Sequence, residues 1–528
     1  MRDYARRGFQ RDPWGEPSPT QQARFADSVT AWRARYSALA RRASPRDTGA
    51  TAALANARLT LSATASELDC RSPLWNVDQL NGLQSRLAFG LNSTPLGAPS
   101  ARDSFIVSMA RFPAATRRLL ANLASGLAQG YSAPQQVTQR VIQQLDGLLA
   151  NDGAALTGPL TRDTSADLRA RWEPIVRDSI VPWLQRYRTF LHDDYLPHAR
   201  AEPGLAALPH GAACYRGRLL QATGTRASPD SLYALAVRQR LALGSGILAA
   251  GRALLGDTVD LISSLRRVRA DPAFVMTDAD SIVAAYTRGV ERARASLPQQ
   301  FSFVPEAPLV VEAIPRAQAA SAPPAQYAGT LGSGPAIFQV NAYQPGGIAT
   351  MNVVLGVAHE GYPGHHFQFI YSAARHAPST GAPLGNGAYV EGWGIYAERL
   401  ASEAGLYDTP LSRLGYLVHQ FDVFMALQVD IGMHARNWTR AQAVDTMMQV
   451  AGRPSAQAAS YADRHATTPA QLATYGIGYL AILGARERAR HALGDRFDPR
   501  AFHDVILSDG DVSLEEMDRR VDRWIKSR

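Results

Sequence analysis

Lysine and cysteine are nearly absent from this chain of 528 residues. The two cysteines, Cys70 and Cys214, exclude a disulfide framework and a cysteine-rich zinc module, and they leave open one disulfide between them. The single lysine, Lys526, lies at the C-terminal end, which argues against a pyridoxal phosphate enzyme or a Schiff-base aldolase. The Gly-Lys-Ser/Thr sequence of a Walker A nucleotide-binding loop is also missing.

Long apolar runs are missing as well. The longest uncharged stretch, Ala317–Ala358, is interrupted by glycine, proline, serine and glutamine, and the more apolar run Leu241–Gly251 is too short for a membrane-spanning helix. The segment Met1–Thr20 is polar and rich in arginine, so it does not resemble a secretory signal peptide. We therefore expect a cytoplasmic protein with no membrane partner.

The basic residues form no long run. The net charge of +9 comes from arginines spread along most of the chain. Such a distribution is typical of a solvated surface, so we expect no nucleic-acid partner. With 46% hydrophobic and 19% charged residues, the composition is that of a folded globular protein with a large core.

Hydrophobic periodicity predicts a mainly α-helical fold. Up to about residue 300, apolar residues recur at helical spacing between short breaks, as in Gln135–Leu149, Leu232–Leu255 and Asp280–Leu297. The pattern is helical again after Met351, where two pairs have the spacing of capping boxes: Thr439 with Gln442, and Ser513 with Glu516. Between these regions, Leu309–Ile314 and Ala336–Asn341 predict two short strands, joined by a mobile connection over Pro315–Pro335.

One segment, from Val357 to Gln368, carries a catalytic motif. It reads Val-Ala-His-Glu-Gly-Tyr-Pro-Gly-His-His-Phe-Gln and begins in an apolar run that predicts a buried helix. A His-Glu pair on such a helix is the first half of the zincin arrangement, in which the histidine binds zinc and the glutamate activates water. Here the pair is His359 and Glu360, and Pro363 replaces the usual second histidine at i+4.

The next histidines, His365 and His366, stand at i+6 and i+7 from His359. On an unbroken helix they would lie about 9 and 10.5 Å further along the axis, too far for one metal ion. A metal site therefore requires a deformed helix, which the intervening glycines and proline permit. The alternative is a helix that ends at Pro363-Gly364, with solvated histidines beyond it.

A downstream carboxylate can complete the site. Glu391 lies in the largely apolar sequence Ala388-Tyr-Val-Glu-Gly-Trp-Gly-Ile-Tyr-Ala-Glu398, and a buried carboxylate needs a cation or strong donors. Two histidines and one glutamate, with a fourth position open to water, form a catalytic zinc set. Glu398 follows two turns later, either as the acceptor for a ligand histidine or as an exposed carboxylate.

These two motifs resemble the bacterial family called domain of unknown function 885, which is itself similar to zinc metallopeptidases whose His-Glu…His motif carries a short insertion. The likeness extends through Val429–His434, Arg464, Pro469–Gly478 and Phe502–Leu507. It covers residues 301–528 well and the first 300 residues mainly in helical character.

The resemblance implies a zinc ion bound by His359, His365 and Glu391, with His366 as the alternative second ligand and Glu360 as general base. Three further roles are implied downstream: oxyanion stabilisation by Tyr475 and His434, and binding of a substrate carboxylate by Arg464. Family members often carry a lysine after this tyrosine, whereas this chain has Gly476. A core tyrosine, a surface histidine and a structural ion pair are the alternative interpretations of Tyr475, His434 and Arg464.

We therefore expect a large helical, zincin-like fold with a small β-sheet beside the active-site helix. Residues 1–300 would form one side of a cleft, and residues 301–528 would form the zinc-binding catalytic region. The expected reaction is zinc-dependent hydrolysis of peptide bonds, with the edge of Ala336–Asn341 open to an extended peptide substrate. The alternatives are a zinc hydrolase of a non-peptide amide and a non-catalytic helical binding protein. No Gly-x-Ser-x-Gly elbow supports a serine hydrolase, and no motif surrounds either cysteine.

Overall fold

The computed structural model describes residues 14–42, 48–94, 96–256, 260–314, 316, 319, 323–330, 335–343, 347–375, 387–508 and 510–528. Helices make up 75% of the structure and strands 5%, so the prediction of a mainly helical fold with small sheets is confirmed. None of the helices in these ranges is long and apolar enough to cross a bilayer.

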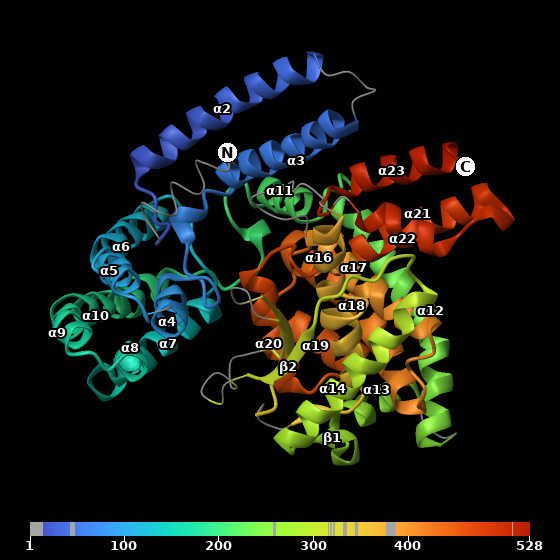
Figure 1. Ribbon diagram of the computed structural model, residues 1–528. Coiled ribbons are helices and arrows are strands. Elements are labelled where there is room, and N and C mark those ends of the chain that lie inside the picture. The colour runs from blue at the N-terminus through green and yellow to red at the C-terminus, as the bar shows by residue number, and fades with distance from the viewer. Residues whose placement is uncertain are drawn as a thin grey trace.

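The first part of the chain forms a helical group with its own core (Figure 1). Its elements are α4 (Leu83–Ser93), α5 (Pro99–Met109), α6 (Phe112–Ala128), α7 (Gln135–Gly153), α8 (Gly158–Arg162), α9 (Ala166–Ile175) and α10 (Val181–Thr189). On α7, the predicted apolar face is buried at Val137, Val141 and Leu145. Two long helices, α2 (Pro19–Arg42) and α3 (Thr48–Cys70), pack on each other and lie across the top of the molecule in Figure 1.

A disulfide joins Cys70 at the end of α3 to Cys214 on α11 (Gly211–Thr223). The sequence left this bond open, and both cysteines are buried. Because the bond spans 144 residues of sequence, it ties the N-terminal helices to the larger body of the molecule.

The larger body is built around long helices that pack side by side. They are α12 (Pro229–Leu255), α13 (Leu261–Ala270), α14 (Ala279–Ser296), α17 (Gly387–Glu403), α18 (Pro410–Ala435), α19 (Arg440–Ala451), α20 (Ser455–Thr467), α21 (Ala473–Leu493), α22 (Pro499–Leu507) and α23 (Leu514–Lys526). Its main core is made of residues that lie between Cys70 and Val521 in the sequence. They come from both sides of position 300, such as Tyr286 and Trp393. The division into two regions at residue 300 stays a prediction.

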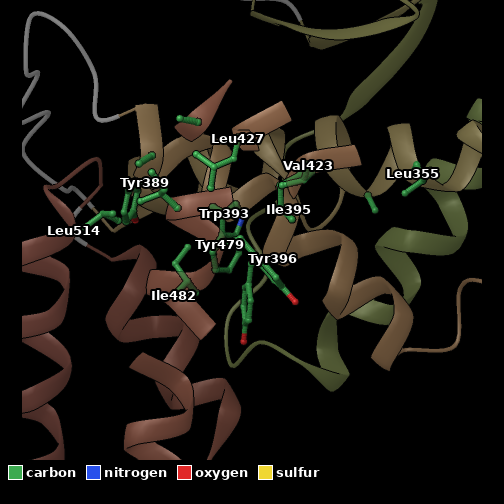
Figure 2. Packing of buried hydrophobic residues seen from close by; sticks show 14 of the residues in the cluster. Leu355, Tyr389, Trp393, Ile395, Tyr396, Val423, Leu427, Tyr479, Ile482 and Leu514 are labelled. Atoms are coloured by element: carbon green, nitrogen blue, oxygen red, sulfur yellow. The ribbon is translucent and has the colours of Figure 1, made fainter. Parts of the chain in front are cut away.

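Helices α17 and α21 make the close contact at the centre of this core (Figure 2). Trp393 and Tyr396 of α17 pack near Tyr479 and Ile482 of α21. A Cβ added at Gly392 would collide with the backbone of Gly478, so glycine is needed here for the two helices to meet backbone to backbone. The contact fixes α17, which carries Glu391 and Glu398.

The three-stranded sheet has the order β2-β4-β3. Strands β2 (Leu309–Ala313) and β4 (Ala336–Val340) pair in parallel and lie where the sequence predicts strands. The predicted mobile connection between them is wrong in one respect, because it contains β3 (Ala325–Thr330), which pairs antiparallel with β4. Strand β4 is therefore central and paired on both sides, so the hypothesis that its edge receives a peptide is also wrong. A second pairing joins β1 (Val275–Met276) to β5 (Ile348–Ala349).

Candidate functional site

The helix that carries His359 deforms and breaks, as a shared metal site requires. Helix α15 (Asn352–Gly356) passes into one π-helical turn over Val357–Gly361, and α16 begins at His365 and ends at Ala374. Between them, Tyr362 is extended and the Tyr362–Pro363 peptide bond is cis. A side chain at Gly364 would collide with the carbonyl of His359, so glycine lets the chain double back over the first histidine.

This reversal brings the two predicted histidine ligands and Glu391 together. Nε2 of His359 lies 3.6 Å, and Nε2 of His365 lies 3.5 Å, from Oε2 of Glu391. With metal–ligand bonds of about 2.0–2.1 Å, tetrahedral coordination places ligand atoms about 3.4 Å apart. Both separations from Glu391 therefore fit the spacing of ligand atoms in a zinc site.

Glu360 is the other candidate carboxylate. Its ligand oxygen and the ring nitrogens of His359 and His365 lie within 4.8 Å of one another, so it also borders the cluster. However, Glu360 Oε2 accepts a hydrogen bond from the backbone N–H of Tyr327 on β3, at 2.9 Å. Glu391 thus faces both imidazoles, while Glu360, which is also near enough to share a metal ion with them, is tied to β3 through Tyr327.

Behind the cluster lies a third carboxylate, Glu398, which is fully buried. Its Oε1 is 2.9 Å from Nδ1 of His359, and its Oε2 is 2.9 Å from Nδ1 of His419 and 3.2 Å from Nε2 of Gln420. The bond to Nδ1 orients the His359 ring so that Nε2 faces Glu391. Of the two interpretations of Glu398, the structure favours the acceptor for a ligand histidine.

The charges of the site match a cation. Burial opposes protonation of His359, but the neighbouring Glu391 and Glu398 outweigh it and hold the pKa of this imidazole well above its usual value. Burial would likewise raise the pKa of Glu391, but His359 and His365 outweigh it and lower that pKa. Three carboxylates around two imidazoles leave negative charge in a largely buried place, which a divalent cation would neutralise.

The sequence between Glu391 and Glu398 fits α17 to the broken helix. A Cβ added at Gly394 would lie 2.5 Å from Cε1 and 2.8 Å from Nε2 of His359, so this glycine leaves room for the imidazole. The indole of Trp393 donates a hydrogen bond to the carbonyl of Pro363, at 2.9 Å. One helix thus supplies a carboxylate, a recess for a histidine and an anchor for the loop.

His366, the alternative second ligand, points elsewhere. Its Nε2 is 3.1 Å from the hydroxyl of Tyr362 and 3.3 Å from the carbonyl of Ala307, and its Nδ1 is 3.4 Å from the hydroxyl of Tyr327. The geometry therefore favours His365 as the ligand that faces Glu391.

Tyr475, at the start of α21, reaches the cluster. Its ring stacks on His359 at 6.1 Å between centroids, and burial together with the charge of Glu391 raises the pKa of its hydroxyl. The phenol is thus neutral and able to donate a hydrogen bond. The charge of Arg464 acts on the same hydroxyl, and the guanidinium donates to Gln471 at 3.0 Å. Arg464 is partly exposed, at the end of α20.

The structure places His434 in a different environment. It is fully buried, its Nδ1 accepts a hydrogen bond from the N–H of Leu205 at 3.1 Å, and its Nε2 is 2.9 Å from the carbonyl of His465. Both ring nitrogens are therefore used inside the protein. The surface alternative for His434 is wrong, and the bonds describe a packing role beside Asp430, which pairs with His465 at 3.3 Å.

Sequence reasoning did not identify Tyr327, Gly394 or His419 as parts of the site. Tyr327 lies in a stretch whose alanine and proline content hides the strand. Gly394 does carry a signal in the sequence, which is its Gly-x-Gly spacing. A second glycine at this spacing indicates that a neighbouring side chain packs closely against the helix. His419 has no local signal.

Two solved structures resemble this chain. One, from Colwellia psychrerythraea, is 24% identical, covers 86% of this chain and 81% of its own length, and gives a TM-score of 0.81. The other, from Shewanella oneidensis, is 20% identical, covers 96% of this chain and 93% of its own length, and gives a TM-score of 0.74. Both are described as putative lipoproteins, the second as one of unknown function. The prediction of a cytoplasmic protein is therefore wrong.

No curated protein matches the sequence. The model of one family, described as bacterial protein of unknown function (DUF885), matches residues 4–521, which is nearly the whole chain. The resemblance first seen in the two central motifs thus extends into the N-terminal helices. The chain belongs to the DUF885 family.

Proposed function

We propose that this protein is a zincin-like metallohydrolase that cleaves peptide bonds. The observation that carries the proposal is the pair of His359 and His365 Nε2 atoms around one oxygen of Glu391, with Glu360 at the border of the same cluster. A purely structural zinc site has four protein ligands and no need of a further carboxylate, whereas a catalytic one has three ligands and a base.

When bound, zinc supplies Lewis acidity, which polarises a carbonyl group and makes water a better proton donor. His359, His365 and Glu391 would hold the ion. Glu360 takes the proton from the attacking water and passes it to the leaving amine, for which its position at the border of the cluster is suited.

Two further groups act on the substrate. The neutral hydroxyl of Tyr475 donates a hydrogen bond to the oxygen that becomes negative as water adds to the carbonyl. Arg464, which acts electrostatically on the same hydroxyl, binds a carboxylate of the substrate. Arg464 is partly exposed, so part of this residue can meet a ligand from solvent.

Strand β3 replaces β4 as the strand that receives an extended substrate. Among the residues that the structure describes, β3 pairs only with β4, and its Tyr327 N–H reaches Glu360. A peptide laid along its free edge would therefore pass beside the base.

We also infer that the protein is exported from the cytoplasm. The two structural relatives are described as lipoproteins, and the disulfide between Cys70 and Cys214 is a bond that persists in an oxidising compartment. Substrates would accordingly be peptides outside the cytoplasm.

A substrate panel of peptides and of simple non-peptide amides tests the proposal, with Glu360→Gln as the matched variant. The change keeps size and hydrogen bonding and removes the base, so we expect peptide hydrolysis to fall by about 10²–10⁴-fold with zinc content unchanged. If only the non-peptide amides were cleaved, the substrates would be non-peptide amides and not peptides. Full peptide hydrolysis by Glu360→Gln would refute the mechanism.

A further inference from the structure

An exposed aromatic side chain lies directly beside the cluster. Phe369 has 43% of its surface exposed, although it stands one turn after His365 on α16. Single exposed apolar residues are common and need no explanation by themselves. Phe369 differs because its neighbours belong to the site.

The ring of Phe369 is part of a row of stacked rings. Its centroid is 6.2 Å from that of His365, with 24° between the planes, and 5.8 Å from that of Tyr327, with 22° between the planes. The same Tyr327 donates its backbone N–H to Glu360. The row thus runs from a proposed metal ligand to the strand that holds the proposed base.

Part of this row is open to solvent beside the cluster, because Phe369 is 43% exposed. A substrate side chain that binds here would lie against the exposed part of the Phe369 ring. An aromatic or large aliphatic side chain would gain both burial and ring contact.

We infer that Phe369 and Tyr327 form the recognition surface for an aromatic or large apolar side chain of the substrate, next to the bond that is cleaved. This inference rests on the proposed function and deepens it by naming the substrate class. Phe369 is then a specificity residue and takes no part in the chemistry.

The matched variants are Phe369→Ala and Phe303→Ala. Phe303 is similarly exposed, at 37%, and contacts Tyr371 of the same helix. Since Tyr371 lies two residues after Phe369, about 200° round the helix, Phe303 lies on the far side of α16 and controls for loss of an exposed ring.

The probes are labelled hexapeptides of alanine and serine that carry one phenylalanine at each position in turn, and a peptide without phenylalanine. Binding is measured by fluorescence anisotropy in the Glu360→Gln background, and cleavage by the active enzyme. We expect the best phenylalanine peptide to bind about tenfold more weakly to Phe369→Ala, which corresponds to about 1.4 kcal/mol, the worth of one ring contact with its burial. Phe303→Ala and the peptide without phenylalanine should show no change.

The outcomes separate the two claims. Phenylalanine-selective binding that depends on Phe369, without cleavage of any peptide, would support the recognition surface and refute the hydrolase. Cleavage with the same selectivity in Phe369→Ala would overturn the recognition surface and leave the hydrolase standing. An absence of binding and of cleavage would overturn both.

Discussion

Substitution of Gly394 by alanine should damage the metal site while leaving the fold intact. In the middle of a helix, replacement of glycine by alanine stabilises by about 0.5–1 kcal/mol when there is space. At Gly394 there is none, because the new Cβ would lie 2.5–2.8 Å from the His359 ring, where ordinary contacts are about 3.5–4.0 Å.

The imidazole would therefore have to move by about 1 Å, against a tolerance of about 0.2 Å for a metal–ligand distance. Its other side is held by Glu398, so it cannot move without losing that bond as well. Changes that disturb the orientation of a ligand typically weaken metal binding about 10–100-fold, and we expect at least this loss of zinc affinity.

The assay is zinc affinity by competition with a chelating dye, together with thermal unfolding of the apoprotein. Gly484→Ala is the matched control, because Gly484 also lies inside a helix, α21, and its added Cβ would have no neighbour closer than 3.9 Å. The control should bind zinc like the wild type. Unchanged zinc affinity in Gly394→Ala would refute the placement of His359 as a ligand between α17 and Glu398.

Three further predictions concern stability. Replacing Cys70 and Cys214 by serine should lower the free energy of unfolding by about 3–5 kcal/mol, because the bond closes a loop of 144 residues, and equal melting of the two forms under non-reducing conditions would contradict this. His503 is buried and its pKa is lowered to about 4, so the unfolded chain binds its proton first. The free energy of unfolding should fall by about 3 kcal/mol as pH drops from 6.5 to 4. In urea titrations, His503→Gln should not show this loss. Asp422→Asn leaves two buried arginines without their carboxylate and should lower the free energy of unfolding by about 3–5 kcal/mol. A melting temperature like that of the wild type would contradict this.

Local signals in the sequence account for much of the fold. The helices α7, α12 and α14 lie within a few residues of the predicted segments, and Thr439 with Gln442 forms the predicted capping box. Ser513 accepts a hydrogen bond from the backbone of Glu516, as a cap should. The missed strand β3 shows the limit, because its pairing with β4 is decided by neighbours that its own composition does not reveal.

Part of the candidate site could likewise be predicted from local sequence, and part could not. The distance between His359 and His365 along the chain required a break in the helix, and the break is there. The bonds of His434 join residues up to 229 positions apart, so no local pattern could distinguish a buried histidine from one that faces a substrate. The prediction of a cytoplasmic protein rested on the polar segment Met1–Thr20, which lacks the usual signal-peptide pattern.

The central claim is that His359, His365 and Glu391 bind zinc. Elemental mass spectrometry of the purified wild type and of His359→Ala, after zinc is offered and the excess removed, tests it most directly, with circular dichroism to verify that both are folded. We predict one zinc per wild-type chain and none in the variant. A folded wild type that retains no metal, or a variant that retains as much as the wild type, would contradict the account.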